Sequence, residues 1–138
     1  MNYLAILACG VLSMILGSIW YGPLFGNAWM KLAGIKKPEK ITPEIKKMMI
    51  RSYGLMFLVS LIMAFVVSNE LQFAGLAIEN VGLIPVVIFA CFQWLGFVVP
   101  STIGSVLWEG RSWKLWFLNA GYTLVQLCLI AAVLSIWK

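Results

Sequence analysis

Four polar side chains near the middle of apolar stretches are the first candidates for chemistry in this sequence. Ser13, Gln93 and Gln126 each lie roughly ten residues, or about 15 Å of helix, from one end of their stretch. Ser60 lies near the middle of another. In antiparallel helices these side chains would form one midplane polar layer, as expected for a solute site. Hydrogen bonds that hold helices together give the same pattern, so the sequence leaves both interpretations open.

The two glutamines of this layer predict a specific contact. An unpaired amide in hydrocarbon costs several kcal/mol, so each amide at this depth needs a partner. We therefore expect Gln93 and Gln126 to hydrogen-bond each other across two neighbouring helices, either directly or through a bridging water.

A second candidate is a pair of charged residues in a short polar segment. Glu109 and Arg111 flank Gly110, and Trp108 and Trp113 lie on either side of all three. We expect an ion pair that stabilises the turn, although an exposed pair contributes only about 1 kcal/mol or less. A gate or a site for a lipid headgroup is the alternative.

The sequence offers few residues for metal binding or acid–base catalysis. The sequence contains no histidine, the usual metal ligand and the side chain that titrates near neutral pH. Cys9, Cys91 and Cys128 lie in apolar stretches without CxxC spacing, so we expect inert thiols. No acidic residue lies in the middle of an apolar stretch, and no carboxylate pair is expected inside a membrane. We expect no catalytic residue, metal site or cofactor, and a protein that is not an enzyme.

The elements that carry these side chains are long apolar stretches. Of the 138 residues, 62% are hydrophobic and only 11% are charged, whereas soluble proteins have about 25% charged residues. Four stretches long enough to cross a bilayer contain no charged residue. We predict an all-α integral membrane protein, one domain over residues 1–138. Its four transmembrane helices are expected at about residues 3–22, 50–69, 83–108 and 115–137, with a cytoplasmic loop at about residues 30–49.

The basic residues predict the orientation. The net charge is +5, and nine of the ten Lys and Arg residues lie in two connecting segments, seven of them from Lys31 to Arg51. The positive-inside rule places both segments in the cytoplasm and both termini outside. We expect the basic loop to contact anionic lipid headgroups and not nucleic acid.

Local signals predict helix ends and bends. The Gly22-Pro23 pair is expected to bend or end the first helix. The run Thr42-Pro43-Glu44 predicts a helix start, with a cap, a proline in the first turn and an acid at the positive end of the dipole. We expect the third helix to be kinked at Pro100, with Ser101 and Thr102 bonding the freed backbone groups.

Small residues spaced four apart predict close helix packing. Such pairs let helix backbones approach each other in membranes, and they leave faces on which a second copy can pack, so we expect a homo-oligomer. The pairs are Ser13 and Gly17, Gly22 and Gly26, and Ser101 and Ser105.

An aromatic pattern at the inner end of the first stretch carries a family resemblance. Aromatic rings settle at the headgroup level, which by itself explains an interfacial belt. The pattern comprises Trp20, Tyr21, Pro23, Phe25, Gly26 and Trp29, and it is joined by residues 108–111 and 119–122. Together these stretches resemble a family of small four-pass bacterial membrane proteins catalogued as a domain of unknown function. The resemblance covers essentially the whole chain and implies four helices in a bacterial cytoplasmic membrane, but no activity.

Three functional hypotheses are compatible with the sequence. The first is a homo-oligomeric helical bundle with a structural or interaction role, favoured by the small and aromatic residues. The second is a small-solute channel or transporter, favoured by the midplane polar layer. A membrane enzyme has the least support, because no nucleophile–base pair or metal cluster is present.

Overall fold

The computed structural model describes residues 1–77 and 81–138, and these residues form helices and connecting segments without a strand. Residues 78–80, which include the acidic residue Glu79, lie outside the described part of the chain. Four helical segments are long and apolar enough to cross a membrane, namely Tyr3–Leu24, Pro43–Phe73, Leu83–Leu107 and Trp113–Ile136. The all-α fold with four such helices agrees with the prediction from composition.

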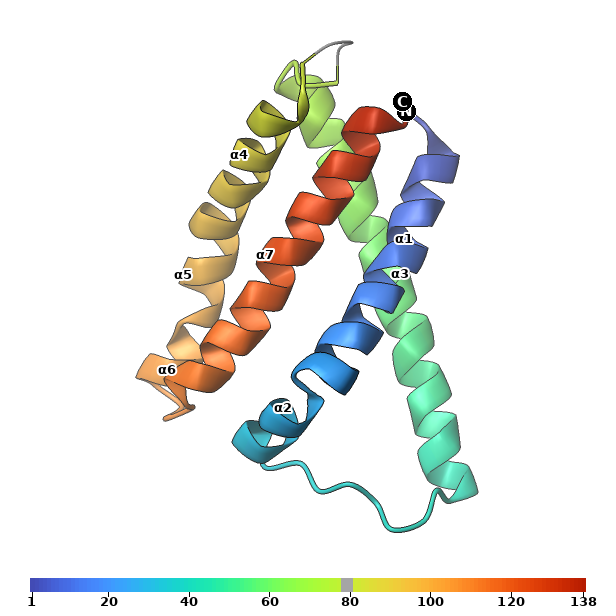
Figure 1. Cartoon of the computed structure of the whole chain (residues 1–138), viewed down its shortest axis with the longest axis vertical. Coiled ribbons are helices and arrows are strands. Elements are labelled where there is room, and N and C mark those ends of the chain that lie inside the picture. The colour runs from blue at the N-terminus through green and yellow to red at the C-terminus, as the bar shows by residue number, and fades with distance from the viewer. Residues whose placement is uncertain (78–80) are drawn as a thin grey trace.

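The first span is interrupted near its C-terminal end. Helix α1 (Tyr3–Ile19) is followed by the π-helical turn η1 (Trp20–Leu24), within which Gly22 leaves the helical dihedral region. Helix α2 (Gly26–Ala33) then continues in a new direction and packs against the fourth span (Figure 1). Pro23 lies inside η1, where its missing N–H and its ring are incompatible with a regular helix.

The second span is one long helix, α3 (Pro43–Phe73), and it starts at the predicted cap. The hydroxyl of Thr42 accepts a hydrogen bond from the backbone N–H of Ile45 at 3.3 Å, and Glu44 lies in the first turn. The helix has 31 residues, which corresponds to about 46 Å, against a hydrocarbon core of about 30 Å. Part of α3 therefore extends beyond the hydrocarbon core.

The third span changes its helical form on both sides of Pro100. Helix α4 (Leu83–Gln93) passes into the π-helical turn η2 (Trp94–Val98), followed by the short helices α5 (Val99–Thr102) and α6 (Gly104–Leu107). The hydroxyl of Thr102 donates to the carbonyl of Val98 at 2.6 Å, and that of Ser101 donates to the same carbonyl at 3.1 Å. Both hydroxyls bond carbonyls of the preceding turn, whereas the carbonyl that Pro100 leaves without its i+4 partner is that of Gly96.

Helix α7 (Trp113–Ile136) forms the fourth span and packs against both hairpins of the chain. It contacts α4 on one side and α1 on the other, while α1 also packs along α3. The two termini lie side by side (Figure 1), where the Asn2 amide donates to the carbonyl oxygen of Lys138 at 3.2 Å. Both termini therefore lie on the same side of the bundle.

The main hydrophobic cluster lies in the half of the bundle that carries the termini, which we call the terminal half, while Leu115, Trp116 and Ala120 are buried in the opposite half. The main cluster is built from the first turns of α1 and α4 and the last turns of α3 and α7. Its buried members are Ala5, Ile6, Cys9, Ala64, Val67, Leu71, Val86, Ala90, Leu127, Ile130, Ala131 and Leu134. Gly10 allows close packing here, because a Cβ at this position would lie 2.6 Å from Leu61 Cδ2.

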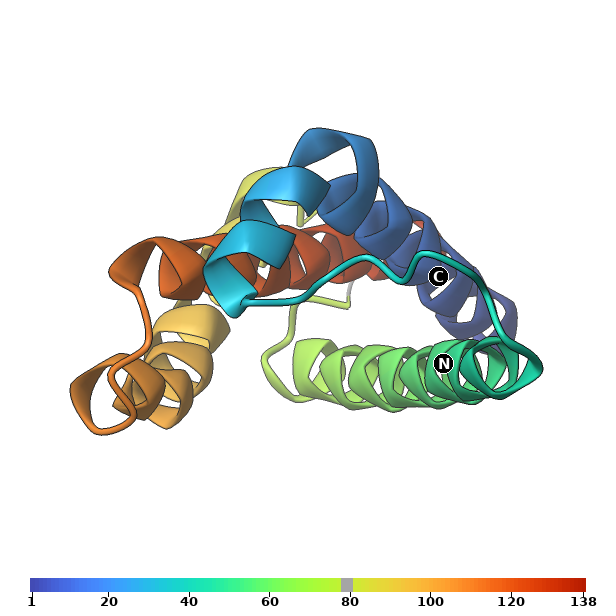
Figure 2. The same cartoon turned by 90° about the horizontal axis from the view of Figure 1, so that it is seen from below.

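The opposite half of the bundle, which we call the loop half, is more open. It contains η1, α2, the first turns of α3 and α7, and the α5–α6 segment. Seen from this end, α2 lies on one side of α7, while α3 and the α5–α6 segment lie on the other side and apart from each other (Figure 2). The two largest cavities described below lie in this half.

Candidate functional site

The first cavity lies between α1, α3 and α7, and we call it the tyrosine cavity. It has a volume of about 560 Å³. Its lining is mostly apolar and aromatic, with several hydroxyl groups and one amide, and carries no charged side chain. The lining residues are Ser13, Met14, Gly17, Ser18, Tyr21, Gly22, Trp29, Tyr53, Met56, Ser60, Asn119 and Tyr122. Hydroxyl and amide groups are thus the available hydrogen-bonding groups of this cavity.

Two serines of the predicted polar layer line the tyrosine cavity. Ser13 and Ser60 are almost fully buried, at 1% and 2% exposure, and both line the cavity. Ser13 Oγ has no hydrogen-bond partner among the described residues. A buried hydroxyl without a partner is unfavourable by about 1–3 kcal/mol. A molecule in the cavity that donates or accepts a hydrogen bond would remove this cost.

Two tyrosines form the polar wall of the cavity. The Tyr21 hydroxyl, at the start of η1, donates to Asn119 Oδ1 on α7 at 2.8 Å. The Tyr122 hydroxyl donates to the backbone carbonyl of Ser13 at 3.3 Å, and the two tyrosine rings lie 5.2 Å apart. The absence of a side chain at Gly17 makes room for this arrangement, because a Cβ there would lie 3.2 Å from the Tyr122 oxygen.

The aromatic pattern of the first span contributes to the interior as well as to the surface. Trp20 donates its indole N–H to the carbonyl of Leu118 on α7 at 3.1 Å, and its ring packs against Phe25 at 4.8 Å. Trp29 contacts the edge of Tyr21 at 5.1 Å and lines the cavity. An interfacial belt is therefore an incomplete description of these residues.

Two further indoles fasten the third span to α7. Trp94, the first residue of η2, donates its N–H to the carbonyl of Ala120 at 2.7 Å. Trp116 on α7 donates to the hydroxyl of Thr102 on α5 at 3.0 Å. The π-helical turns η1 and η2 thus both begin at a tryptophan that bonds a carbonyl of α7.

The second cavity lies between the α5–α6 segment and α7, and we call it the α5–α7 cavity. It has a volume of about 500 Å³ and shares Asn119 with the tyrosine cavity. Its lining includes the hydroxyls of Ser101, Thr102, Ser105 and Thr123, the charged side chains of Glu109 and Arg111, and the apolar side chains of Val98, Leu115 and Trp116. This cavity therefore combines charged and apolar walls.

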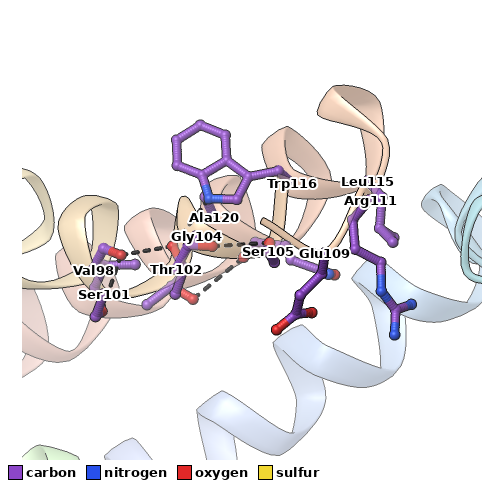
Figure 3. Close-up of a pocket in the computed structure, with 12 residues that line it drawn as sticks. Val98, Ser101, Thr102, Gly104, Ser105, Glu109, Arg111, Leu115, Trp116 and Ala120 are labelled. Atoms are coloured by element: carbon purple, nitrogen blue, oxygen red, sulfur yellow. Dashed lines mark hydrogen bonds between the residues drawn. The ribbon is translucent and has the colours of Figure 1, made fainter. Parts of the chain in front are cut away.

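The predicted ion pair between Glu109 and Arg111 is not formed in the part of the chain that the structure describes. Gly110 adopts a left-handed conformation (φ +68°), and the backbone N–H of Arg111 donates to the carbonyl of Ser105 at 3.1 Å. This turn extends both side chains to the same side of the loop, with their charged ends apart (Figure 3). Both charges are available to a ligand.

The predicted direct hydrogen bond between Gln93 and Gln126 is not formed among the described residues, and Gln93 has a different partner. Its amide donates to Glu70 Oε2 on α3 at 3.0 Å, while Gln126 is buried on α7 at 4% exposure. Glu70, near the end of α3, thus reaches the last residue of α4. The polar layer is thus divided between the tyrosine cavity and a contact from α3 to α4.

A groove lies between α3 and the third span, and Glu70 and Gln93 form part of its lining. It has a volume of about 320 Å³ and is apolar except near Glu70, Gln93 and Thr123. Its walls are formed by Val59, Ile62, Met63, Val66 and Val67 on α3, Phe97 and Val98 on η2, and Leu127 on α7. Val98 and Thr123 line both this groove and the α5–α7 cavity.

The three stretches on which the family resemblance rests meet around Asn119. Tyr21 from the first stretch contacts Asn119 directly, and residues 119–122 supply Tyr122 to the same cavity. Glu109 and Arg111, from residues 108–111, line the neighbouring cavity, which also includes Asn119. Asn119 and Tyr122 were not among the predicted site residues, although the resemblance already singles out their stretch.

Comparisons with known proteins place the chain in a family without assigning an activity. The family described as "Protein of unknown function (DUF1761)" matches residues 4–135. Neither the curated proteins nor the solved structures include a match to the chain.

Proposed function

The chain belongs to the DUF1761 family, and since that family has no known function, we propose one from the geometry: the protein binds a small uncharged polar solute in the tyrosine cavity and carries it across a membrane. The observation that carries the proposal is a cavity with hydrogen-bonding walls in one half of the bundle and an apolar core in the other.

The lining of the tyrosine cavity supports an uncharged solute. A charge moved out of water is strongly disfavoured unless an opposite charge pairs with it, and no lining residue of this cavity is charged. The hydroxyls of Ser13, Ser60 and Tyr53 and the amide of Asn119 suit neutral donors and acceptors. Polyols, amides and similar small molecules fit this chemistry.

The distribution of packing supports transport over simple binding. Solute that enters from the loop half meets the apolar core at Ser13 and Ser60, so passage requires the terminal half to open. By the positive-inside rule we assign the loop half to the cytoplasmic face of a bacterial inner membrane and the termini to the outer face. The cavity is then open to the cytoplasm. We assign the chain no catalytic reaction and no cofactor.

Swelling of proteoliposomes tests the proposal. Purified protein in vesicles should accelerate entry of at least one neutral probe among glycerol, erythritol and urea, while sodium glutamate should enter no faster than in protein-free vesicles. Ser13→Ala should slow entry of that probe without loss of thermal stability, because it removes a hydroxyl that lacks a protein partner.

Ser68→Ala is the matched control, since Ser68 is a buried serine of the terminal half outside the tyrosine cavity. Entry of every neutral probe at the protein-free rate would argue against transport through this bundle.

A structural role in a homo-oligomer is the second candidate, and the outer face of α3 favours it. Leu55, Leu58 and Phe65 form an exposed apolar stripe with helical spacing on this face. Native mass spectrometry of the protein from nanodiscs prepared at several protein-to-lipid ratios tests this candidate. A monomer at every protein-to-lipid ratio would exclude a permanent oligomer.

A further inference from the structure

The α5–α7 cavity and the groove between α3 and the third span adjoin each other along α7 and together outline one candidate path. Val98 and Thr123 belong to both. One end of the path carries Glu109 and Arg111, close to the exposed indoles of Trp108 and Trp113, which by their type belong at the headgroup level of a membrane. The other end is lined mainly by apolar side chains of α3 and η2, with Glu70 and Gln93 also in its lining. The path is therefore charged at the membrane surface and apolar toward the membrane interior.

The charged end offers two unused groups of opposite sign. Neither the Arg111 guanidinium nor the Glu109 carboxylate has a side-chain partner in the described part of the chain, and both face the cavity (Figure 3). A guanidinium binds phosphate oxygens through two parallel hydrogen bonds. A carboxylate accepts hydrogen bonds from an ammonium group.

The hydroxyls of Thr102 and Ser105 can accept hydrogen bonds from a ligand, because their own hydrogens are already donated to backbone carbonyls. Thr102 donates its hydroxyl hydrogen to the carbonyl of Val98, and Ser105 donates its own to the carbonyl of Thr102. Their remaining lone pairs suit a ligand with several N–H donors. A primary ammonium has three such donors, whereas a quaternary ammonium has none.

We infer that this path binds a phospholipid with a primary amine in its headgroup, such as phosphatidylethanolamine. The phosphate contacts Arg111, the ammonium contacts Glu109, and one acyl chain lies along the groove between α3 and η2. A free zwitterion would use the charged end but would leave the apolar groove without a role. The apolar groove beside the charged cavity therefore favours a lipid over a water-soluble ligand. This site is separate from the solute site of the tyrosine cavity.

Lipid competition in native mass spectrometry tests the inference. Protein in nanodiscs or micelles is exposed to equal amounts of phosphatidylethanolamine, phosphatidylcholine and phosphatidylglycerol with identical acyl chains. We expect phosphatidylethanolamine to be retained about tenfold more than either competitor, as one charge-assisted hydrogen bond provides. Equal retention of the three lipids would overturn the inference.

Charge-matched variants assign the two contacts. Glu109→Gln should remove the preference for phosphatidylethanolamine over phosphatidylglycerol, while Glu44→Gln, an exposed acid at the start of α3, should keep it. Arg111→Gln should weaken retention of all three phospholipids, whereas Lys114→Gln, a basic residue in the first turn of α7 outside the cavity, should not. A preference that survives Glu109→Gln would contradict the assignment.

A headgroup without acyl chains separates a lipid site from a zwitterion site. Glycerophosphoethanolamine in large excess should fail to displace the lipid from the wild-type protein. Complete displacement would show that the apolar groove contributes nothing and would overturn the lipid assignment. Because none of these measurements involves solute entry, their outcome is independent of the transport proposal.

Discussion

Tyr21 and Asn119 lie 98 positions apart in the sequence and meet through a hydrogen bond of 2.8 Å. No local pattern links two residues at such a separation, so the polar layer was predicted only from depth along each helix. Ser13 and Ser60 line the same cavity, in agreement with their similar depth, because both helices are regular up to these positions. The same argument did not predict the partner of Gln93, because depth along a helix does not determine which side chains of neighbouring helices face each other.

The packing of Tyr122 against Gly17 gives a prediction at the scale of single residues. Gly17→Ala places a methyl group 3.2 Å from the Tyr122 oxygen, so the ring must move and its hydrogen bond to Ser13 weakens. We expect a loss of about 1 kcal/mol in the free energy of unfolding and slower entry of the neutral probe. Thermal unfolding in micelles and vesicle swelling measure the two effects.

Gly54→Ala is the control for this substitution. Gly54 lies within α3 and has open space where the methyl group of an alanine would lie, so the change should stabilise the helix by up to about 1 kcal/mol. Equal effects of the two substitutions would show that Tyr122 does not depend on Gly17.

At the scale of elements, the sequence was informative wherever the signal is local. The apolar stretches predicted the four spans, and the Thr42 cap predicted the start of α3. The π-helical turns η1 and η2 were not predicted, although a break at Gly22-Pro23 was. Each turn begins at a tryptophan whose indole bonds a carbonyl of α7, so its form is tied to packing between segments distant in sequence.

The contact between Glu70 and Gln93 is a polar connection between α3 and α4, and it gives an element-scale prediction. A double-mutant cycle with Leu at both positions should show a coupling of about 0.5–2 kcal/mol, because each single change leaves the other side chain without its partner. Thermal unfolding in micelles measures the four free energies.

Asn69 provides the comparison for this cycle, since its amide donates to the carbonyl of Phe65 in the same helix. The cycle of Asn69→Leu with Gln93→Leu should be additive. A coupling as large as that of Glu70 would point to a general effect of leucines on α3 and not to a direct hydrogen bond.

At the scale of the whole molecule, the charge distribution predicts which side the loop half faces. Both termini lie together at the opposite end from the basic segments. In a variant without native cysteines, Lys37→Cys and Ser112→Cys should resist a membrane-impermeant thiol reagent added to intact cells, and Gln72→Cys should react. Labelling of Lys37→Cys from outside would reverse the assigned orientation.

The proposed transport depends on a bundle that is open in its loop half and closed by an apolar core in its terminal half, and thiol accessibility from each side is the sharpest test of this division. In the variant without native cysteines, Met56→Cys, in the lining of the tyrosine cavity, and Val67→Cys, in the core, are compared in sealed vesicles of both orientations. A charged thiol reagent should modify Met56→Cys from the loop side only, and Val67→Cys from neither side. Modification of Val67→Cys from the terminal side, or protection of Met56→Cys from both sides, would show that the bundle is not divided in this way.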